Sequence, residues 1–161
     1  MTYEDAYYHK LLLQFGFDGG YDAWLDGWLE AENPLSDIVL ALADCGSDRN
    51  RTVSVLHNFY LNQKIDEPAV CDRLRLFLKE EYLAGRMDRN AVLKAMVTFA
   101  SAHEYPCCDP WYSMYVLYWH HRESTETGWF SEKSFMPIFE AYLLEGIPYP
   151  NPAAAGCTKP V

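Results

Sequence analysis

Two adjacent histidines and a nearby glutamate are the residues of this sequence whose types and spacing best suit catalysis. His120 and Glu123 lie three positions apart, so on a helix they share a face. With His121 they could bind a metal ion or transfer protons, because imidazoles and carboxylates are zinc ligands and acid–base catalysts. A helical metal site also needs ligands from facing helices, and neither His57 nor His103 brings one at motif spacing. The alternative is two cations at a helix C-terminus, where the helix dipole favours them.

Motifs for other enzyme and cofactor classes are missing from the sequence. It has no G-x-S-x-G, P-loop or G-x-G-x-x-G. His103-Glu104 is not followed by the second histidine that the H-E-x-x-H motif of zinc proteases requires. A calcium loop starting at Asp18 would place Gly20 and Ala23 where the loop needs an acid or amide and a glycine. We therefore expect no cofactor.

The strongest charge pattern lies on a helix predicted over residues 21–32. At about 100° per residue, its aromatic and leucine side chains fall on one side of the helix. Its acids fall on the other side, at successive i, i+4 steps: Asp22, Asp26 and Glu30. Like charges at this spacing cost about 0.2–0.5 kcal/mol per pair, and no lysine or arginine within the helix offsets them. The pattern is typical either of a solvated helix face or of a docking ridge for a basic partner.

Two acids outside that helix, Asp18 and Asp37, extend the pattern toward a larger negative surface. The term "acidic surface" here means Asp18, Asp22, Asp26, Glu30 and Asp37. Such a surface attracts a cationic protein over a distance and speeds its association. Arg49 and Arg51 form a short basic segment next to these acids. The segment is too small to bind nucleic acid, and its arginines are expected to pair with neighbouring acids.

The net charge is concentrated in the first third of the chain. The 161 residues carry 13 Lys and Arg against 23 Asp and Glu, a net charge of −10. Residues 1–48 hold ten of the acids and a single base, Lys10, so their net charge is −9 and that of residues 49–161 is −1. Binding of nucleic acid requires clustered Lys and Arg. The balance therefore predicts a basic protein partner and no nucleic acid.

The sequence also predicts a cytoplasmic protein that does not enter a membrane. No run of residues approaches the roughly 18 consecutive apolar residues of a transmembrane helix. The first residues are acidic and aromatic, unlike the positively charged start of a secretory signal. Five cysteines without a C-x-x-C pair favour free thiols in a reducing compartment. The adjacent pair Cys107-Cys108 indicates packing or, alternatively, a redox pair.

Helices along almost the whole chain must position these residues. Apolar residues recur at helical spacing and alternation of period two is missing. The expected fold is an all-α single domain of about seven to eight helices over residues 1–146, without β-sheet. It would be a compact bundle or a stack of antiparallel helix pairs. Residues 147–161 contain four prolines and are predicted to form an extended tail.

Several residue pairs predict where individual helices begin. Asn33-Pro34 and Asp109-Pro110 each combine an N-cap residue with a proline at the first helical position. Further caps are predicted at Ser47 or Asp48, at Asp88, and at Ser131 or Ser134. The run 111–119 is apolar or aromatic nearly all round, so its helix is expected at the centre of the fold.

No family motif is present in the chain. In composition alone it resembles small, acidic, cytoplasmic bacterial proteins that bind one basic partner, of which toxin-immunity proteins are an example. The leading hypothesis is therefore a non-enzymatic binding protein whose acidic N-terminal third docks a cationic protein, masking a nucleic-acid-binding surface of that partner. The alternatives are a small metal-dependent enzyme using His120, His121 and Glu123, and a structural adaptor with an aromatic concave face.

Overall fold

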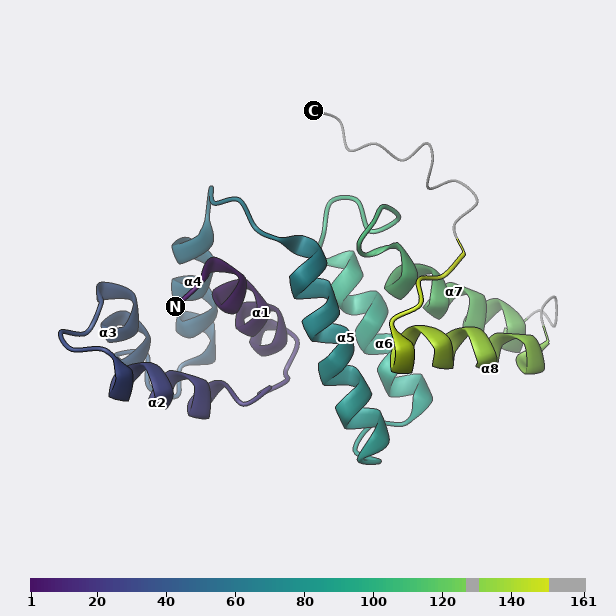
Figure 1. Ribbon diagram of the computed structural model, residues 1–161, viewed down its shortest axis with the longest axis horizontal. Helices are drawn as coiled ribbons and strands as arrows, with labels where there is room; N and C mark the ends of the chain where they lie inside the picture. The colour runs from purple at the N-terminus through teal and green to yellow at the C-terminus, as the bar shows by residue number, and fades with distance from the viewer. Residues whose placement is uncertain (127–130, 151–161) are drawn as a thin grey trace. The chain divides into compact units, whose positions relative to one another are not determined.

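A computed structural model describes residues 1–126 and 131–150, and it confirms the all-α prediction (Figure 1). Within these residues there are eight α-helices, one π-helix and no strand. The elements are α1 (Tyr3–Gln14), α2 (Tyr21–Ala31), α3 (Asp37–Ala43), α4 (Arg49–Tyr60), α5 (Glu67–Leu83), α6 (Arg89–Ser101), α7 (Tyr112–Glu126), α8 (Glu132–Glu140) and the π-helix η1 (Ala141–Glu145).

Three predicted helix starts are confirmed by their capping hydrogen bonds. The Asp48 carboxylate accepts from the backbone N–H of Arg51 at 3.0 Å, and the Asp88 carboxylate accepts from Ala91 at 2.7 Å. Ser131 is the N-cap of α8. These bonds satisfy N–H groups that the first turn of a helix leaves without a partner.

The two starts predicted from X-Pro pairs are wrong. The helix expected at Asn33-Pro34 begins at Asp37, after the N-cap Ser36. The reason lies in Glu32, whose carboxylate accepts from the Ser36 backbone N–H at 2.9 Å and from its hydroxyl at 2.7 Å. This contact fixes residues 33–35 as a loop.

The helix expected at Asp109-Pro110 begins at Tyr112 instead. There the backbone N–H groups of Trp111 and Tyr112 both donate to the carbonyl of Cys108, at 3.1 and 3.0 Å. A tight turn therefore precedes α7 and delays its first helical residue.

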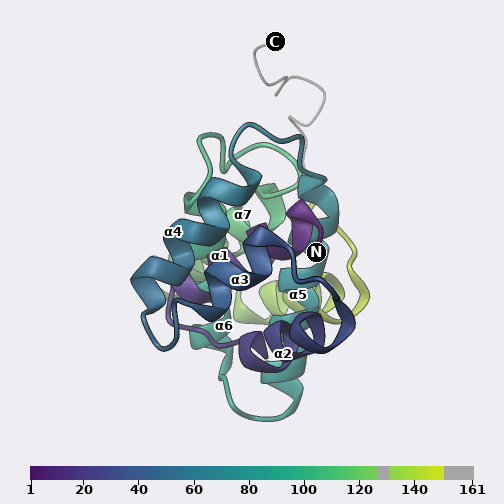
Figure 2. The same ribbon diagram turned by 90° about the vertical axis from the view of Figure 1, so that its left-hand side faces the viewer.

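The helices gather into two compact units, Met1–Val70 and Cys71–Val161. In the first unit α1 packs on α4, and α3 contacts both α2 and α4 (Figure 2). One cluster of its core consists of the buried residues Ala6, Leu13, Tyr21, Leu42 and Leu56. The prediction of one domain ending at residue 146 stays a prediction, and most of the predicted tail lies outside the described residues.

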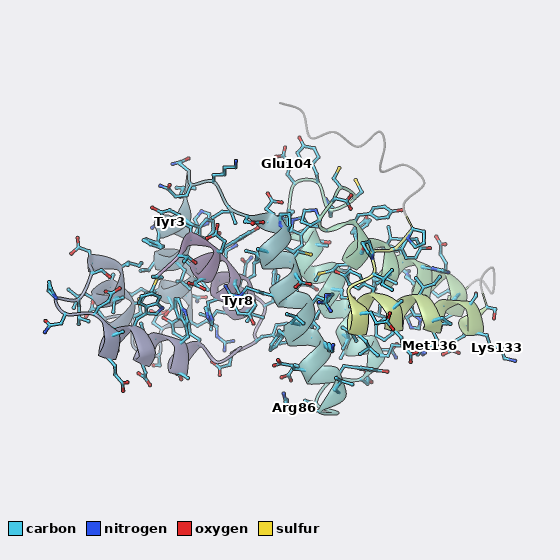
Figure 3. All side chains as sticks on the ribbon, viewed as in Figure 1. Tyr3, Tyr8, Arg86, Glu104, Lys133 and Met136 are labelled. Atoms are coloured by element: carbon cyan, nitrogen blue, oxygen red, sulfur yellow. The ribbon has the colours of Figure 1, made fainter. Side chains whose placement is uncertain are left out.

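In the second unit α7 packs on α6 and on α8. The helix of run 111–119, expected at the centre of the fold, is not covered on every side, because Trp119 is 38% exposed while Met114 and Leu117 are fully buried. Arg89 of α6 donates to Glu132 at 2.6 Å and to the sulfur of Met136, which Figure 3 labels on α8, at 3.0 Å.

Two basic side chains of α5 hold the end of η1. The buried Arg75 donates to the Leu143 carbonyl at 2.9 Å, and Lys79 donates to the Leu144 carbonyl at 2.7 Å. Arg75 also pairs with Asp72 at 2.7 Å. Carbonyls at a helix end have no partner within the helix, so these donors replace the missing hydrogen bonds and compensate the burial of the guanidinium.

Candidate functional site

The acidic surface begins at a turn that glycine makes possible. Gly19 and Gly20 have φ of +59° and +73°, in the left-handed region that favours glycine. Gly20 is the N-cap of α2, and the backbone N–H of Tyr21 donates to the Asp18 carbonyl at 3.2 Å. This turn ends the connection from α1 and places Asp18 three residues before Tyr21, the first residue of α2.

The inner face of α2 is fixed by aromatic contacts. The Trp24 ring lies against His9 of α1, with centroids 4.2 Å apart, and Tyr21 contacts Trp24 at 5.6 Å. His9 is only 3% exposed and Tyr21 6%. Sequence reasoning passed over His9, although the spacing of Ala6, His9 and Leu13 places it on the inward side of α1.

All members of the acidic surface are exposed, as the helical periodicity of α2 predicts. Asp22, Asp26 and Glu30 lie on α2, and Asp37 is the first residue of α3, which packs against α2. Asp18 and Asp22 line one pocket. Asp26, Glu30 and Asp37 do not line that pocket.

The other acids of residues 1–48 have intramolecular roles. Each accepts a hydrogen bond that caps a helix or fixes a loop, or forms an ion pair. They are Glu4 with the Asp66 N–H, Asp5 in the capping box of α1, Glu32 with Ser36, Asp44 with Arg51, and Asp48 at the start of α4. Half of the acids in this third of the chain thus stabilise the fold.

The five acids of the acidic surface have no such role. Within residues 1–126 and 131–150 none of them forms an ion pair or accepts a side-chain hydrogen bond. Arg49 and Arg51 were expected to pair with neighbouring acids. This is confirmed for Arg51, which forms an ion pair with Asp44. Arg49 pairs with none of the described acids.

The pocket between the starts of α2 and α4 has a volume of about 190 Å³. It is lined by Leu13, Asp18, Tyr21, Asp22, Gly46, Ser47, Arg49 and Thr52. Burial raises the pKa of Tyr21 to about 12. Thr52 counters part of this rise through a contact that falls short of hydrogen-bond geometry. The Thr52 hydroxyl instead donates to the Asp48 carbonyl at 3.0 Å.

The histidines of the enzyme hypothesis face different partners. His120 Nδ1 lies 3.0 Å from the Tyr149 hydroxyl, and His121 Nε2 lies 2.9 Å from the Asn90 side-chain oxygen. Burial lowers the pKa of both imidazoles, and Glu123 opposes the shift at His120. Among the described residues no group of three or more His, Cys, Asp or Glu is arranged to hold a metal ion. The geometry therefore gives the metal hypothesis no support.

The cysteines differ from the expectation of free thiols at one position. Cys45, Cys71 and Cys107 form no disulfide, and the Cys71 thiol donates to the Pro110 carbonyl at 3.4 Å, whereas Cys108 is disulfide-bonded. The expectation is therefore wrong for Cys108. The argument from free thiols to a reducing compartment loses part of its basis, since disulfides are typical of oxidising compartments.

No protein-family model matches the chain, and the searches of curated proteins and of solved structures found no match either. Within the described residues, no helix combines the length and the apolar character that crossing a membrane would require. The case for a function therefore depends on the geometry of the two units themselves.

Proposed function

We propose that this protein is a non-enzymatic binding protein whose acidic surface docks a basic protein partner. One observation carries the proposal: five of the ten acids in residues 1–48 stabilise the fold, and the other five are exposed without an ion pair among the described residues. A fold that needed these charges only for its own stability would give them partners or space them apart. On α2 they instead repeat at a spacing that costs stability.

The spacing on α2 defines what a partner should present. Four residues of α-helix rise about 6 Å, so Asp22 and Glu30 lie roughly 12 Å apart along the axis with Asp26 between them. Lysines or arginines at every fourth residue of a helix match this spacing. Alternate residues of an extended strand, about 6.6 Å apart, match it as well.

An apolar residue lies close to this charge pattern. Leu40 is 49% exposed on α3, three residues after Asp37 and therefore on the same side of that helix. Protein interfaces combine an apolar centre with a polar rim. Leu40 supplies the apolar contact that charged residues alone lack.

The test compares capture of proteins from a lysate of the source cells by three forms of the full chain. The first is wild type and the second carries Asp22→Asn, Asp26→Asn and Glu30→Gln. The third is a control with the same change of net charge on exposed acids of the second unit: Glu80→Gln, Glu140→Gln and Glu145→Gln. Quantitative mass spectrometry measures recovery at about 50 mM and about 300 mM salt.

We expect a basic protein to be recovered by wild type and by the control, and lost from the α2 variant. Its recovery should also fall at the higher salt concentration, because salt screens exposed charges. Equal recovery of every protein by all three forms contradicts the proposal. Recovery that is insensitive both to salt and to the α2 changes favours the structural adaptor.

Inhibition of a bacterial toxin is one specific form of such binding, and the composition of the chain supports it. The basic partner would then be the toxin, and docking would mask its nucleic-acid-binding surface. A cytoplasmic location belongs to the same proposal.

A further inference from the structure

The pocket between the starts of α2 and α4 is lined by charges of both signs, and docking of a basic protein does not explain the positive one. Asp18 and Asp22 line it from the α2 side, and Arg49 lines it from α4. The two acids belong to the acidic surface, whereas Arg49 has the opposite sign and would repel a basic partner. A role for the pocket must therefore account for all three charges.

The opposite charges of the pocket do not neutralise one another. No nitrogen of Arg49 lies within 4.0 Å of a carboxylate of the described residues, although two acids line the same pocket of about 190 Å³. Arg51, two residues further along α4, does pair with Asp44. Charges of opposite sign that line one small space without pairing leave room for a ligand that contacts both.

The remaining lining adds hydrogen-bonding and apolar groups. Ser47 and Thr52 contribute hydroxyls, and Leu13 and Tyr21 contribute apolar surface from the core of the unit. The start of α4 beside the pocket is capped by the Asp48 carboxylate, and Gly20 is the N-cap residue of α2. The pocket is smaller than the roughly 300–1,000 Å³ of sites for drug-sized molecules, so its size fits a small metabolite.

We propose that this pocket binds a free basic amino acid, with its carboxylate on Arg49 and its two cationic groups on Asp18 and Asp22. Two acids and one base on the wall complement two cations and one anion on the ligand. Guanidinium and carboxylate groups form strong paired hydrogen bonds. The carboxylate of a bound arginine can pair in this way with the Arg49 guanidinium, and its own guanidinium can pair with a carboxylate of the pocket. The Ser47 hydroxyl completes the polar contacts of the ligand, and the Thr52 oxygen, whose hydrogen is donated to the Asp48 carbonyl, can accept from it.

The test is isothermal titration calorimetry of the full chain with L-arginine, L-lysine and agmatine, which is arginine without its carboxylate. The variants are Arg49→Gln and Asp22→Asn. The matched controls are Arg51→Gln on the same helix and Asp26→Asn on α2, neither of which changes a residue lining the pocket. Circular dichroism confirms that each variant is folded before it is titrated.

We expect saturable binding of L-arginine or L-lysine to wild type and both controls. Binding should be at least tenfold weaker in Arg49→Gln and in Asp22→Asn. Agmatine, which has no group for Arg49 and carries two positive charges, should bind Arg49→Gln at least as tightly as it binds wild type. The absence of saturable binding of both amino acids to wild type overturns the proposal, as does equal affinity in wild type and Arg49→Gln.

The same variants separate this proposal from the protein-docking function. Arg49→Gln removes a positive charge beside the acidic surface, so it should leave capture of a basic protein intact while amino-acid binding is lost. If no amino acid binds and capture still depends on Asp22, Asp26 and Glu30, only the pocket proposal fails. If amino acids bind and no protein is captured, only the docking proposal fails.

Discussion

Two adjacent glycines before α2 should respond very differently to the same substitution. Both Gly19 and Gly20 have positive φ, so alanine at either position must adopt a left-handed conformation. This costs about 1–2 kcal/mol. It is partly offset by about 0.4–1 kcal/mol, because alanine lowers the entropy of the unfolded chain. Around Gly20 there is open space for a Cβ atom. Gly20→Ala should therefore lower the unfolding free energy by about 0–1.6 kcal/mol.

At Gly19 an added side chain would also meet the buried side chain of Leu12. A Cβ atom at this position would overlap Cδ1 of Leu12 and lie 3.3 Å from its Cγ. Leu12 is fully buried, so its side chain can turn only by displacing other core atoms. Overpacking of this kind costs about 1–3 kcal/mol. Gly19→Ala should therefore be less stable than Gly20→Ala by about that amount.

Urea denaturation of the full chain, monitored by far-UV circular dichroism and tryptophan fluorescence, measures the difference in unfolding free energy between Gly19→Ala and Gly20→Ala. Hydrogen exchange at the amides of α1 and α2 then localises the loss to the first unit. If the two variants differ by less than about 0.5 kcal/mol, Leu12 yields at no cost and the reasoning from its burial is refuted.

Two further predictions concern charge and pH. Asp26→Asn removes both like-charge i, i+4 pairs of α2, so the unfolding free energy should rise by about 0.4–1 kcal/mol; a decrease in urea denaturation would show that the acids stabilise the helix. Burial lowers the pKa of His120 from its ordinary 6.5, so the unfolded chain binds the proton more readily and stability should fall as the pH drops below about 6.5. The urea midpoint should fall less in His120→Gln than in wild type between about pH 7 and about pH 5.5; an equal fall would contradict the role of His120.

Features set by neighbouring residues were predictable from the sequence. The caps at Asp48 and Asp88 involve bonds across three residues, and the outward position of Asp26 follows from helical periodicity. The start of α3 was predicted wrongly because it depends on a side-chain bond between Glu32 and Ser36 that propensities do not report.

Features set by residues distant in sequence could not be predicted. The burial of Arg75 depends on a carbonyl 68 residues away. The pocket depends on packing that brings Arg49 of α4 to the turn before α2. From sequence, Arg49 and Arg51 looked equivalent, and only the structure shows that one of them pairs with Asp44.

The contacts that hold η1 impose an order on the formation of the second unit during synthesis. The backbone partners of Arg75 and Lys79 are made 68 and 65 residues after them, so α5 leaves the ribosome long before these carbonyls exist. Until then the Arg75 guanidinium remains hydrated, with Asp72 as its early partner. Burial of the Arg75 guanidinium against the Leu143 carbonyl can therefore be completed only after η1 has been made.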